Sequence, residues 1–341
     1  MTITFKNVGQ GDSVILSWQD NGKEKIGIID CRKVANQNPI INHLNELDWK
    51  KTEIEFLFLS HPHYDHFSGI FNLLEFCEAN HLTIKKFGHS FHLHPAYPYF
   101  EELLDWVNLD NNRTSQLKDM VEKVIKLEKD NLIKKIVGLA ENVKFTLNSE
   151  YTFHCLRPSD KDKRNFASNV NIYRKQNDFI NASNQANLLS TIFQLESNEH
   201  FVLFTSDATL EVLDNILIHD MDEYFKNKKM ILAQVPHHGS KYNHQPVFWS
   251  SVVHSINIPM VISAGSHQKY NHPHEDVIKD FIQKYKLYAT NHVNGITTYL
   301  SQREKDKSNK LNMISEIHEI FGQEGDQSFK LKFGAALYNK S

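Results

Sequence analysis

Cysteine is scarce in this chain, and the few cysteines lie far apart. Only three occur among the 341 residues, at Cys31, Cys77 and Cys155. Thiols at such separations form neither the disulfide framework of a small secreted domain nor the paired cysteines of a zinc ribbon. The sequence therefore predicts a protein of a reducing compartment, and we expect it in the cytoplasm.

Long apolar runs and an excess of positive charge are also missing. No stretch approaches the roughly 18 apolar residues that a membrane span requires. Residues 1–5 lack the basic and apolar regions that begin a signal peptide. The formal net charge is −3, which argues against a broad basic platform for long duplex DNA. We therefore expect a globular protein with no membrane partner.

Apolar runs and helical spacing alternate through the first eighty residues. The runs at residues 14–16 and 26–29 predict two strands, and residues 54–59 predict a buried strand. Residues 36–50 and 69–80 have the apolar spacing of helices. This alternation is typical of an α/β layered fold.

The remainder of the chain predicts further elements of both kinds. An amphipathic pattern at residues 99–140 indicates a helical insertion, and the Asn-rich residues 159–187 indicate a long loop. Charged residues 301–310 indicate a linker, so we expect one domain over residues 1–300 and a tail to residue 341. Further strands are expected at residues 144–147, 151–156, 188–195, 201–205, 230–235, 259–263, 295–300 and 329–333, and helices at 210–218 and 275–286.

The densest group of potential metal ligands follows the strand expected at residues 54–59. Three histidines and an aspartate fall within six positions, at His61, His63, Asp65 and His66. Neutral imidazole nitrogen and carboxylate oxygen suit zinc, manganese or iron. Because a rigid strand end can aim several side chains at one point, the cluster predicts a metal site.

Three more expected strands end in residues of the same chemical type. Asp30 follows residues 26–29, Asp207 follows residues 201–205, and His237 with His238 follow residues 230–235. In a layered α/β fold such strand ends can lie along one edge, where active sites collect.

The order of these residues resembles that of the metallo-β-lactamase superfamily. Four strings, VGQGDS at residues 8–13, FTSDA at 204–208, PHHGSK at 236–241 and YNHPH at 270–274, narrow the resemblance. They are similar to the hydrolase domain of the competence protein ComEC and its stand-alone relatives. The resemblance covers most of residues 1–300, except the insertion at residues 99–140. The resemblance implies a βαβα sandwich, with two mixed sheets flanked by helices.

The resemblance also implies a site for two divalent metal ions, zinc or manganese. Two ions about 3.5–4 Å apart would clamp a hydroxide and stabilise the charge of an in-line displacement. The implied ligands are His61 and His63 for the first ion, Asp65, His66 and His237 for the second, and Asp207 between the two.

Other positions are expected beside the metals. Asp30 would orient a ligand through a hydrogen bond. Asp12, in the loop at residues 9–12, would either lie near the metals or only form a tight turn. Many members of the superfamily carry a further histidine for the first metal. The competence-type branch has an Asn/Ser motif in that place, and here Asn187-Leu188-Leu189-Ser190 stands there, which predicts a first site that is weak, water-filled or empty.

The function that follows is that of a metal-dependent phosphodiesterase or nuclease. Asp65 would hold or deprotonate the attacking water, and His238 or His272, or His237 itself, would steady the leaving oxygen. Ser240 and Lys241 are expected to contact the substrate. The net charge favours a nucleotide or a short single strand over long duplex DNA.

Two other functions use the same residues. The metals could polarise the carbonyl of a lactam, lactone or thioester. Alternatively, the protein could bind metal without catalysis and sense a ligand. The sequence leaves open the bond that is cut, the role of the insertion and the oligomeric state.

Overall fold

The computed structural model describes residues 1–91, 113–253, 255–267, 270–306, 318, 321–332 and 335–339. The chain forms two compact units. The first consists of Met1, Asp12–Lys144 and Cys155–Ile192, and the second of Thr2–Gly11, Phe145–His154 and Phe193–Ser341.

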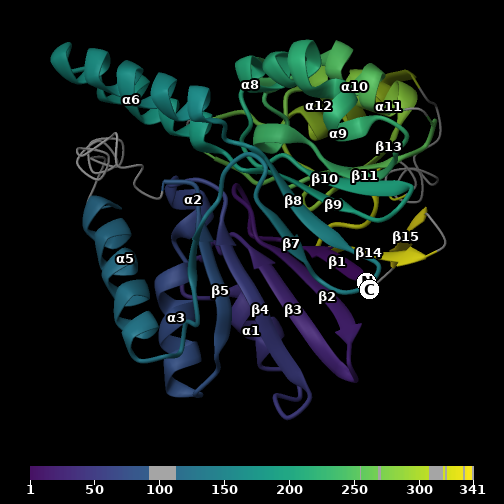
Figure 1. Cartoon of the computed structure of the whole chain (residues 1–341). Coiled ribbons are helices and arrows are strands. Elements are labelled where there is room, and N and C mark those ends of the chain that lie inside the picture. Colours follow the sequence, from purple (N-terminus) through teal and green to yellow (C-terminus); the bar gives the residue numbers. More distant parts are fainter. Residues whose placement is uncertain are drawn as a thin grey trace. The chain divides into compact units, whose positions relative to one another are not determined.

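The first unit contains a mixed sheet (Figure 1) in the strand order β2-β3-β4-β5-β6. Strand β2 (Val14–Asp20) pairs antiparallel with β3 (Lys23–Ile29) through a turn at Asn21 and Gly22, both with positive φ. Strands β4 (Thr52–Leu59), β5 (Ile84–His89) and β6 (Ile136–Gly138) continue the sheet in parallel. The carboxyl ends of β3 and β4 therefore lie side by side.

The helices of the first unit bury apolar stripes. In α3 (Ile70–Ala79) the buried residues Ile70, Leu73, Leu74 and Cys77 recur at the spacing of one helical face. Figure 1 shows α3 and α5 beside β5. The helices of this unit are α1 (Pro39–Leu44), α2 (Tyr64–Phe67), α3, α5 (Arg113–Lys129), α6 (Asp160–Lys175) and α7 (Phe179–Asn184), with the 3-10 helix η1 (Gln185–Leu189).

The second unit contains another mixed sheet. Strand β9 (Ile192–Glu196) begins at the unit boundary and pairs antiparallel with β10 (His200–Phe204). Strands β11 (Lys229–Gln234), β12 (Pro259–Ile262) and β13 (Lys286–Ala289) follow in parallel. The residues after β10 and after β11 are therefore neighbours at one edge of this sheet.

The C-terminal strands belong to this second unit. Strand β14 (Gln327–Lys332) pairs antiparallel with β1 (Thr2–Phe5) and with β15 (Ala335–Asn339). Residues expected to form a tail thus pair with the first strand of the chain. The predicted domain boundary near residue 300 stays a prediction.

The helices of the second unit are gathered on one face of its sheet (Figure 1). They are α8 (Leu210–Asn215), the π-helix η2 (Ile216–Asp220), α9 (Met221–Phe225), η3 (Pro236–Gly239), η4 (Lys241–Asn243), α10 (Pro246–Val252), α11 (Glu275–Lys284) and α12 (Gly295–Asp306). Strands β7 (Lys144–Thr146) and β8 (Thr152–Arg157) lie where the chain passes between the units.

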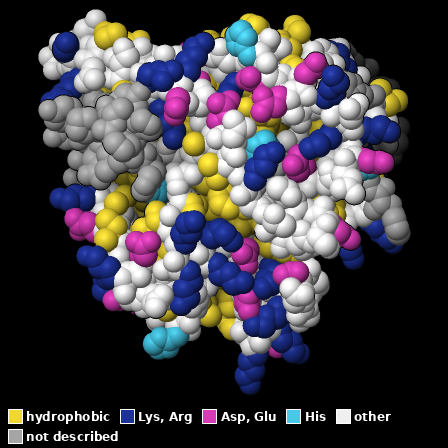
Figure 2. All heavy atoms as spheres, viewed as in Figure 1, with side chains coloured by type: hydrophobic (Ala, Val, Ile, Leu, Met, Phe, Trp, Pro, Cys, Tyr) yellow, Lys and Arg dark blue, Asp and Glu magenta, His cyan; other side chains and the backbone are white. Residues whose placement is uncertain are grey.

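Two mixed sheets flanked by helices confirm the predicted α/β fold class. Among the described residues, no helix is both long enough and apolar enough to cross a membrane. On the face drawn in Figure 2, Lys and Arg side chains are interspersed with Asp and Glu. Some of the charged side chains of the protein pair locally, since Glu53 binds Lys25 and Lys85, and Glu55 binds Lys85 and Lys86.

The long loop predicted at residues 159–187 is wrong, because α6, α7 and η1 occupy most of it. Ser159 starts α6 with a capping box, in which its side chain and that of Asp162 bond reciprocally to backbone N–H groups. Phe166 and Val170 then bury one face of the helix. Asn165, Asn169 and Asn171 therefore lie in a helix that this cap and this packing stabilise.

The strand predicted at residues 295–300 is also wrong, because these residues begin α12. Thr297 and Thr298 favour strands, but their hydroxyls donate to the carbonyls of His292 and Asn294 one turn earlier. Ile296 is buried. Packing and local hydrogen bonds therefore override strand propensity here.

Smaller corrections concern the ends of elements. The helix expected at residues 36–50 stops at Leu44, and the strand expected at 188–195 begins only at Ile192, after η1. Helix α5 agrees with the helical insertion, but β6 within it is a strand that pairs with β5. Residues 99–112 of that region lie outside the described residues, and so do residues 307–310 of the predicted linker.

Candidate metal centre

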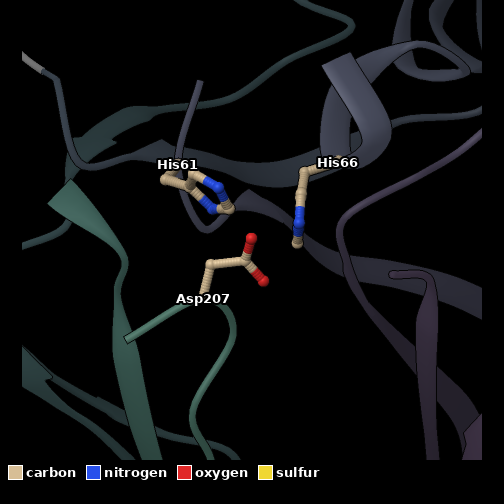
Figure 3. Close-up of side chains that lie close together, drawn as sticks. All are labelled: His61, His66 and Asp207. Atoms are coloured by element: carbon tan, nitrogen blue, oxygen red, sulfur yellow. The ribbon is translucent and has the colours of Figure 1, made fainter. Parts of the chain in front are cut away.

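The histidine motif begins where β4 ends. Strand β4 lies between β3 and β5, and its last residues are buried. The carbonyl of Ser60, the next residue, accepts hydrogen bonds from the backbone and hydroxyl of Thr191 and from the Ser90 hydroxyl. These three bonds fix the backbone from which His61 projects (Figure 3).

Asp30 orients His66. It follows β3 with φ 58°, and its buried carboxylate accepts bonds of 2.7 Å from the Ser60 N–H and from the Ser60 hydroxyl. His66 Nδ1 lies 2.8 Å from the same carboxylate. Burial raises the pKa of the Asp30 carboxyl, and the neighbouring His66 opposes that rise. A carboxylate on one ring nitrogen fixes the direction of the other, as is usual for metal-binding histidines.

Asp12 completes a potential ligand group in the first unit. Asp12, Asp30 and His66 offer one atom each within 4.8 Å of one another, and all three are buried. His66 Nδ1 is 3.8 Å from an Asp12 carboxylate oxygen, and the Asp12 N–H donates to the Asp65 carbonyl. Asp65 is half-buried in the first turn of α2.

His61 and His63 face each other. His61 Nε2 is 3.1 Å from His63 Nδ1, and their remaining nitrogens lie near the Ser60 hydroxyl and, at 2.9 Å, the Ser183 carbonyl of α7. The His61 ring centroid is also 4.1 Å from that of His66. The first unit thus brings three of the four predicted ligands of the motif together as imidazoles.

Residues 187–190 are buried and include polar atoms without hydrogen-bond partners among the described residues. Asn187 lies within η1, and Ser190 follows the end of η1. The next residue, Thr191, donates a hydrogen bond to the Ser60 carbonyl. Asn187 Oδ1 and Ser190 Oγ have no hydrogen-bond partner among the described residues. A buried acceptor without a partner costs about 1–3 kcal/mol, so a cation or water at Asn187 fits this observation.

In the second unit, Asp207 and the histidine pair come from neighbouring strands. Ser206 follows β10 with φ 47°, and His237 and His238 follow β11 with φ 48° and 55°. The His237 N–H donates to the Ser206 carbonyl and ties the two loops together. These left-handed conformations, rare for residues with a Cβ, turn the side chains at the strand ends.

Both histidines are directed at Asp207. His237 Nε2 lies 3.4 Å from one oxygen of its buried carboxylate, and His238 Nε2 lies 3.6 Å from the other. Figure 3 draws the Asp207 carboxylate at the end of its strand. Asn243 Oδ1 is 2.9 Å from His237 Nδ1, and the Ser263 carbonyl is 3.0 Å from His238 Nδ1. Each ring therefore has one anchored nitrogen and one directed at a carboxylate.

The assignment of His237 as the ligand and His238 as a catalytic residue stays a prediction. The two rings make equivalent contacts with Asp207, although His238 is fully buried and His237 is partly open.

His272 lies beside this pair. Its ring centroid is 5.2 Å from that of His237, and its buried Nδ1 has no hydrogen-bond partner in the described part of the chain. Burial, assisted by the neighbouring His237 and His238, lowers the pKa of His272 to about 3, so the ring is neutral. Lys241 is exposed, and the Ser240 hydroxyl accepts a bond from the Tyr242 N–H.

Two contributors to the site had no clear signal in the sequence. Asn243, which holds His237 and donates to the Ala208 carbonyl, follows the histidine pair in an ordinary polar stretch. Gly265 allows the loop of Gly9 and Gln10 to approach, since a Cβ there would lie 2.0 Å from the Gln10 nitrogen. Only the spatial contact reveals these roles.

No family model and no curated protein matches the chain. Solved structures of the metallo-β-lactamase fold are similar to it at low identity. YhfI from Bacillus subtilis, a metallo-β-lactamase fold protein, is 10% identical with a TM-score of 0.43, and the match covers 83% of this chain and 94% of that one. Zn²⁺-bound PqqB from Methylobacterium extorquens is 9% identical with a TM-score of 0.36, covering 69% and 72%. A diphosphatase of the PhnP family is 11% identical with a TM-score of 0.38, covering 84% and 93%. At these values the likeness says nothing about what this chain binds or cleaves.

Proposed function

We propose that this protein is a metal-dependent hydrolase of phosphodiesters. The observation that carries the proposal is the buried Asp207 carboxylate, which faces two histidines whose other nitrogens are anchored. This donor set, together with His66 on Asp30, has the chemistry and the supporting hydrogen bonds of ligands for a divalent metal.

The proposed ligands keep the roles implied by the motif resemblance to ComEC-type hydrolases. When bound, two divalent ions would lower the pKa of a water molecule toward about 7 and neutralise charge on the phosphate. The ligands are His61 and His63 for one ion, Asp65, His66 and His237 for the other, and Asp207 for both.

The protein's own residues would then handle protons and orientation. The Asp65 carboxylate would accept a hydrogen bond or a proton from the attacking water. His272, whose buried Nδ1 lacks a partner among the described residues, would contact the leaving oxygen, with His238 as the neighbouring candidate. Lys241 would contact a non-bridging phosphate oxygen. The carboxylates suit the oxygen-rich coordination that phosphoryl transfer uses.

The test is turnover by purified protein loaded with Mn²⁺ or Zn²⁺. The substrates are bis-p-nitrophenyl phosphate, single-stranded DNA, RNA and cyclic dinucleotides, with nitrocefin, lactones and glutathione thioesters as the comparison set. We expect turnover only in the first set. Turnover only in the second set would establish the lactam, lactone or thioester alternative. Bound metal without any turnover would favour a non-catalytic metal-binding or ligand-sensing protein.

A further inference from the structure

Tyr242 presents an open aromatic ring beside the proposed centre. Tyr242 is 73% exposed. Among the described residues, the ring contacts His274 edge-on, at 6.1 Å and 81° between planes, and has the Lys241 ammonium 5.2 Å from its centroid. Most of its surface therefore meets water.

The backbone that carries this ring is fixed. The Tyr242 N–H donates to the Ser240 hydroxyl, and the Asn243 N–H donates to the Ser240 carbonyl. Asn243, the next residue, is buried and holds His237 Nδ1. Tyr242 is thus one position from the residue that orients a proposed metal ligand, and a rigid support of this kind suits a binding surface.

Tyr270 provides a comparison, because its ring stacks on other rings of the protein. Tyr270 stacks on His267 at 4.9 Å and 23°, and on His272 at 5.6 Å and 21°. These nearly parallel neighbours use the faces of the Tyr270 ring within the protein. Tyr242 has no parallel ring among the described residues.

We infer that Tyr242 and Lys241 form a platform for a nucleobase and its adjacent phosphate. An open aromatic face stacks on bases of any sequence, and a neighbouring ammonium binds the backbone charge. The inference rests on the proposed function and narrows its substrate to a phosphodiester flanked by a nucleobase, such as a nucleotide or a single strand.

The binding test uses fluorescein-labelled oligo(dT) with phosphorothioate linkages, which resist cleavage, and an abasic strand of equal length. Anisotropy gives the Kd for wild type, Tyr242→Ala, Tyr242→Phe and the control Ile218→Ala, whose parent side chain is 70% exposed in the same unit. We expect Tyr242→Ala to weaken oligo(dT) binding at least about fivefold, the size of one base stack. Tyr242→Phe and Ile218→Ala should bind like wild type, and the abasic strand should not distinguish the variants.

Lys241→Gln tests whether the Lys241 ammonium binds the backbone charge of the strand. We expect the slope of log Kd against log salt concentration to fall by about 0.7, the value for one lost contact with a single strand. Equal weakening of both strands by Tyr242→Ala, or no weakening of either, would overturn the platform.

Turnover of bis-p-nitrophenyl phosphate and of single-stranded DNA by the same proteins separates the two proposals. Tyr242-dependent oligonucleotide binding without phosphodiester turnover would keep the platform and overturn the proposed function. Cleavage of single-stranded DNA that is indifferent to Tyr242→Ala, with unchanged Kd, would keep the function and overturn the platform.

Discussion

His66 of the first unit and the histidine pair of the second unit are oriented by different chemistry. In the first unit His66 Nδ1 lies against the Asp30 carboxylate, and its neighbours His61 and His63 come from the same short motif. In the second unit His237 and His238 are anchored by neutral oxygens, an amide of Asn243 and the backbone of Ser263. A carboxylate partner raises the basicity of an imidazole ligand, whereas a neutral acceptor mainly fixes its tautomer and direction.

The difference predicts how each unit contributes to binding a metal. The first unit offers a compact group of imidazoles with a charged support. The second offers one carboxylate, Asp207, toward which two imidazole rings point. We therefore expect the loss of Asp207 to be the most damaging single change, and the losses of supporting residues to differ between the units.

Asp207→Asn is expected to lower kcat/KM on a phosphodiester by at least about 10³-fold, because several kcal/mol of charge stabilisation depends on metals that this carboxylate holds. The substitution keeps the size of the side chain. Turnover with saturating Mn²⁺ measures the effect, and circular dichroism checks the fold. A loss below tenfold in a folded protein would show that Asp207 is not a ligand.

Asp30→Asn tests the charged support against the neutral one. We expect about a 10- to 100-fold loss of metal affinity or activity, the usual effect of removing a ligand's hydrogen-bonding partner. Asn243→Ala should cost less affinity, near the lower end of that range, because a neutral acceptor is lost. Metal titration of both variants makes the comparison, and equal losses would contradict the distinction drawn between the units.

Asn187→His sharpens the account of the first unit. Asn187 Oδ1 is buried without a hydrogen-bond partner among the described residues, and a histidine there would supply a nitrogen donor. We expect zinc affinity to rise by about tenfold, or roughly 1.4 kcal/mol. Competition with a chelator measures it. An unchanged or weaker affinity, with the fold intact, would place Asn187 away from the metal.

The smallest predicted effect concerns His244, a histidine that has a carboxylate partner yet is not a proposed ligand. Burial lowers the pKa of His244, although Asp280 at 2.9 Å acts in the opposite direction. The unfolded chain therefore binds the proton more readily, and the free energy of unfolding should fall as the pH drops below about 6.5, by at most about 1.4 kcal/mol per pH unit.

Urea unfolding of wild type and His244→Gln between pH 5 and 8 checks this. The variant should show a flatter dependence on pH, and a steeper one would contradict the sign of the shift.

The candidate site was predictable to the extent that its residues follow the ends of apolar strands. His61, His63 and His66 are consecutive enough to stand out, and Asp30 and Asp207 each end an apolar run. Their supports come from residues remote in sequence, such as Ser183 for His63 and Ser263 for His238. No local pattern distinguishes such residues from other polar ones.

The fold class followed from the alternation of strands and helices, but α6 and α12 were mispredicted. The capping box of Ser159 and Asp162 was a readable helix signal, obscured by the asparagines that follow. The threonines of α12 carry strand propensity that tertiary packing overrides. Composition alone therefore misled where local bonds to the backbone decided the structure.

The central claim is that His66 and Asp207 are ligands of the metals on which the proposed activity depends. Mass-spectrometric counting of metal per chain, after loading with Zn²⁺ or Mn²⁺ and removal of excess, tests it most directly in wild type, His66→Ala and Asp207→Asn. The account predicts about two ions in wild type and fewer in each variant, whichever unit carries the change. An equal count in all three proteins would contradict it.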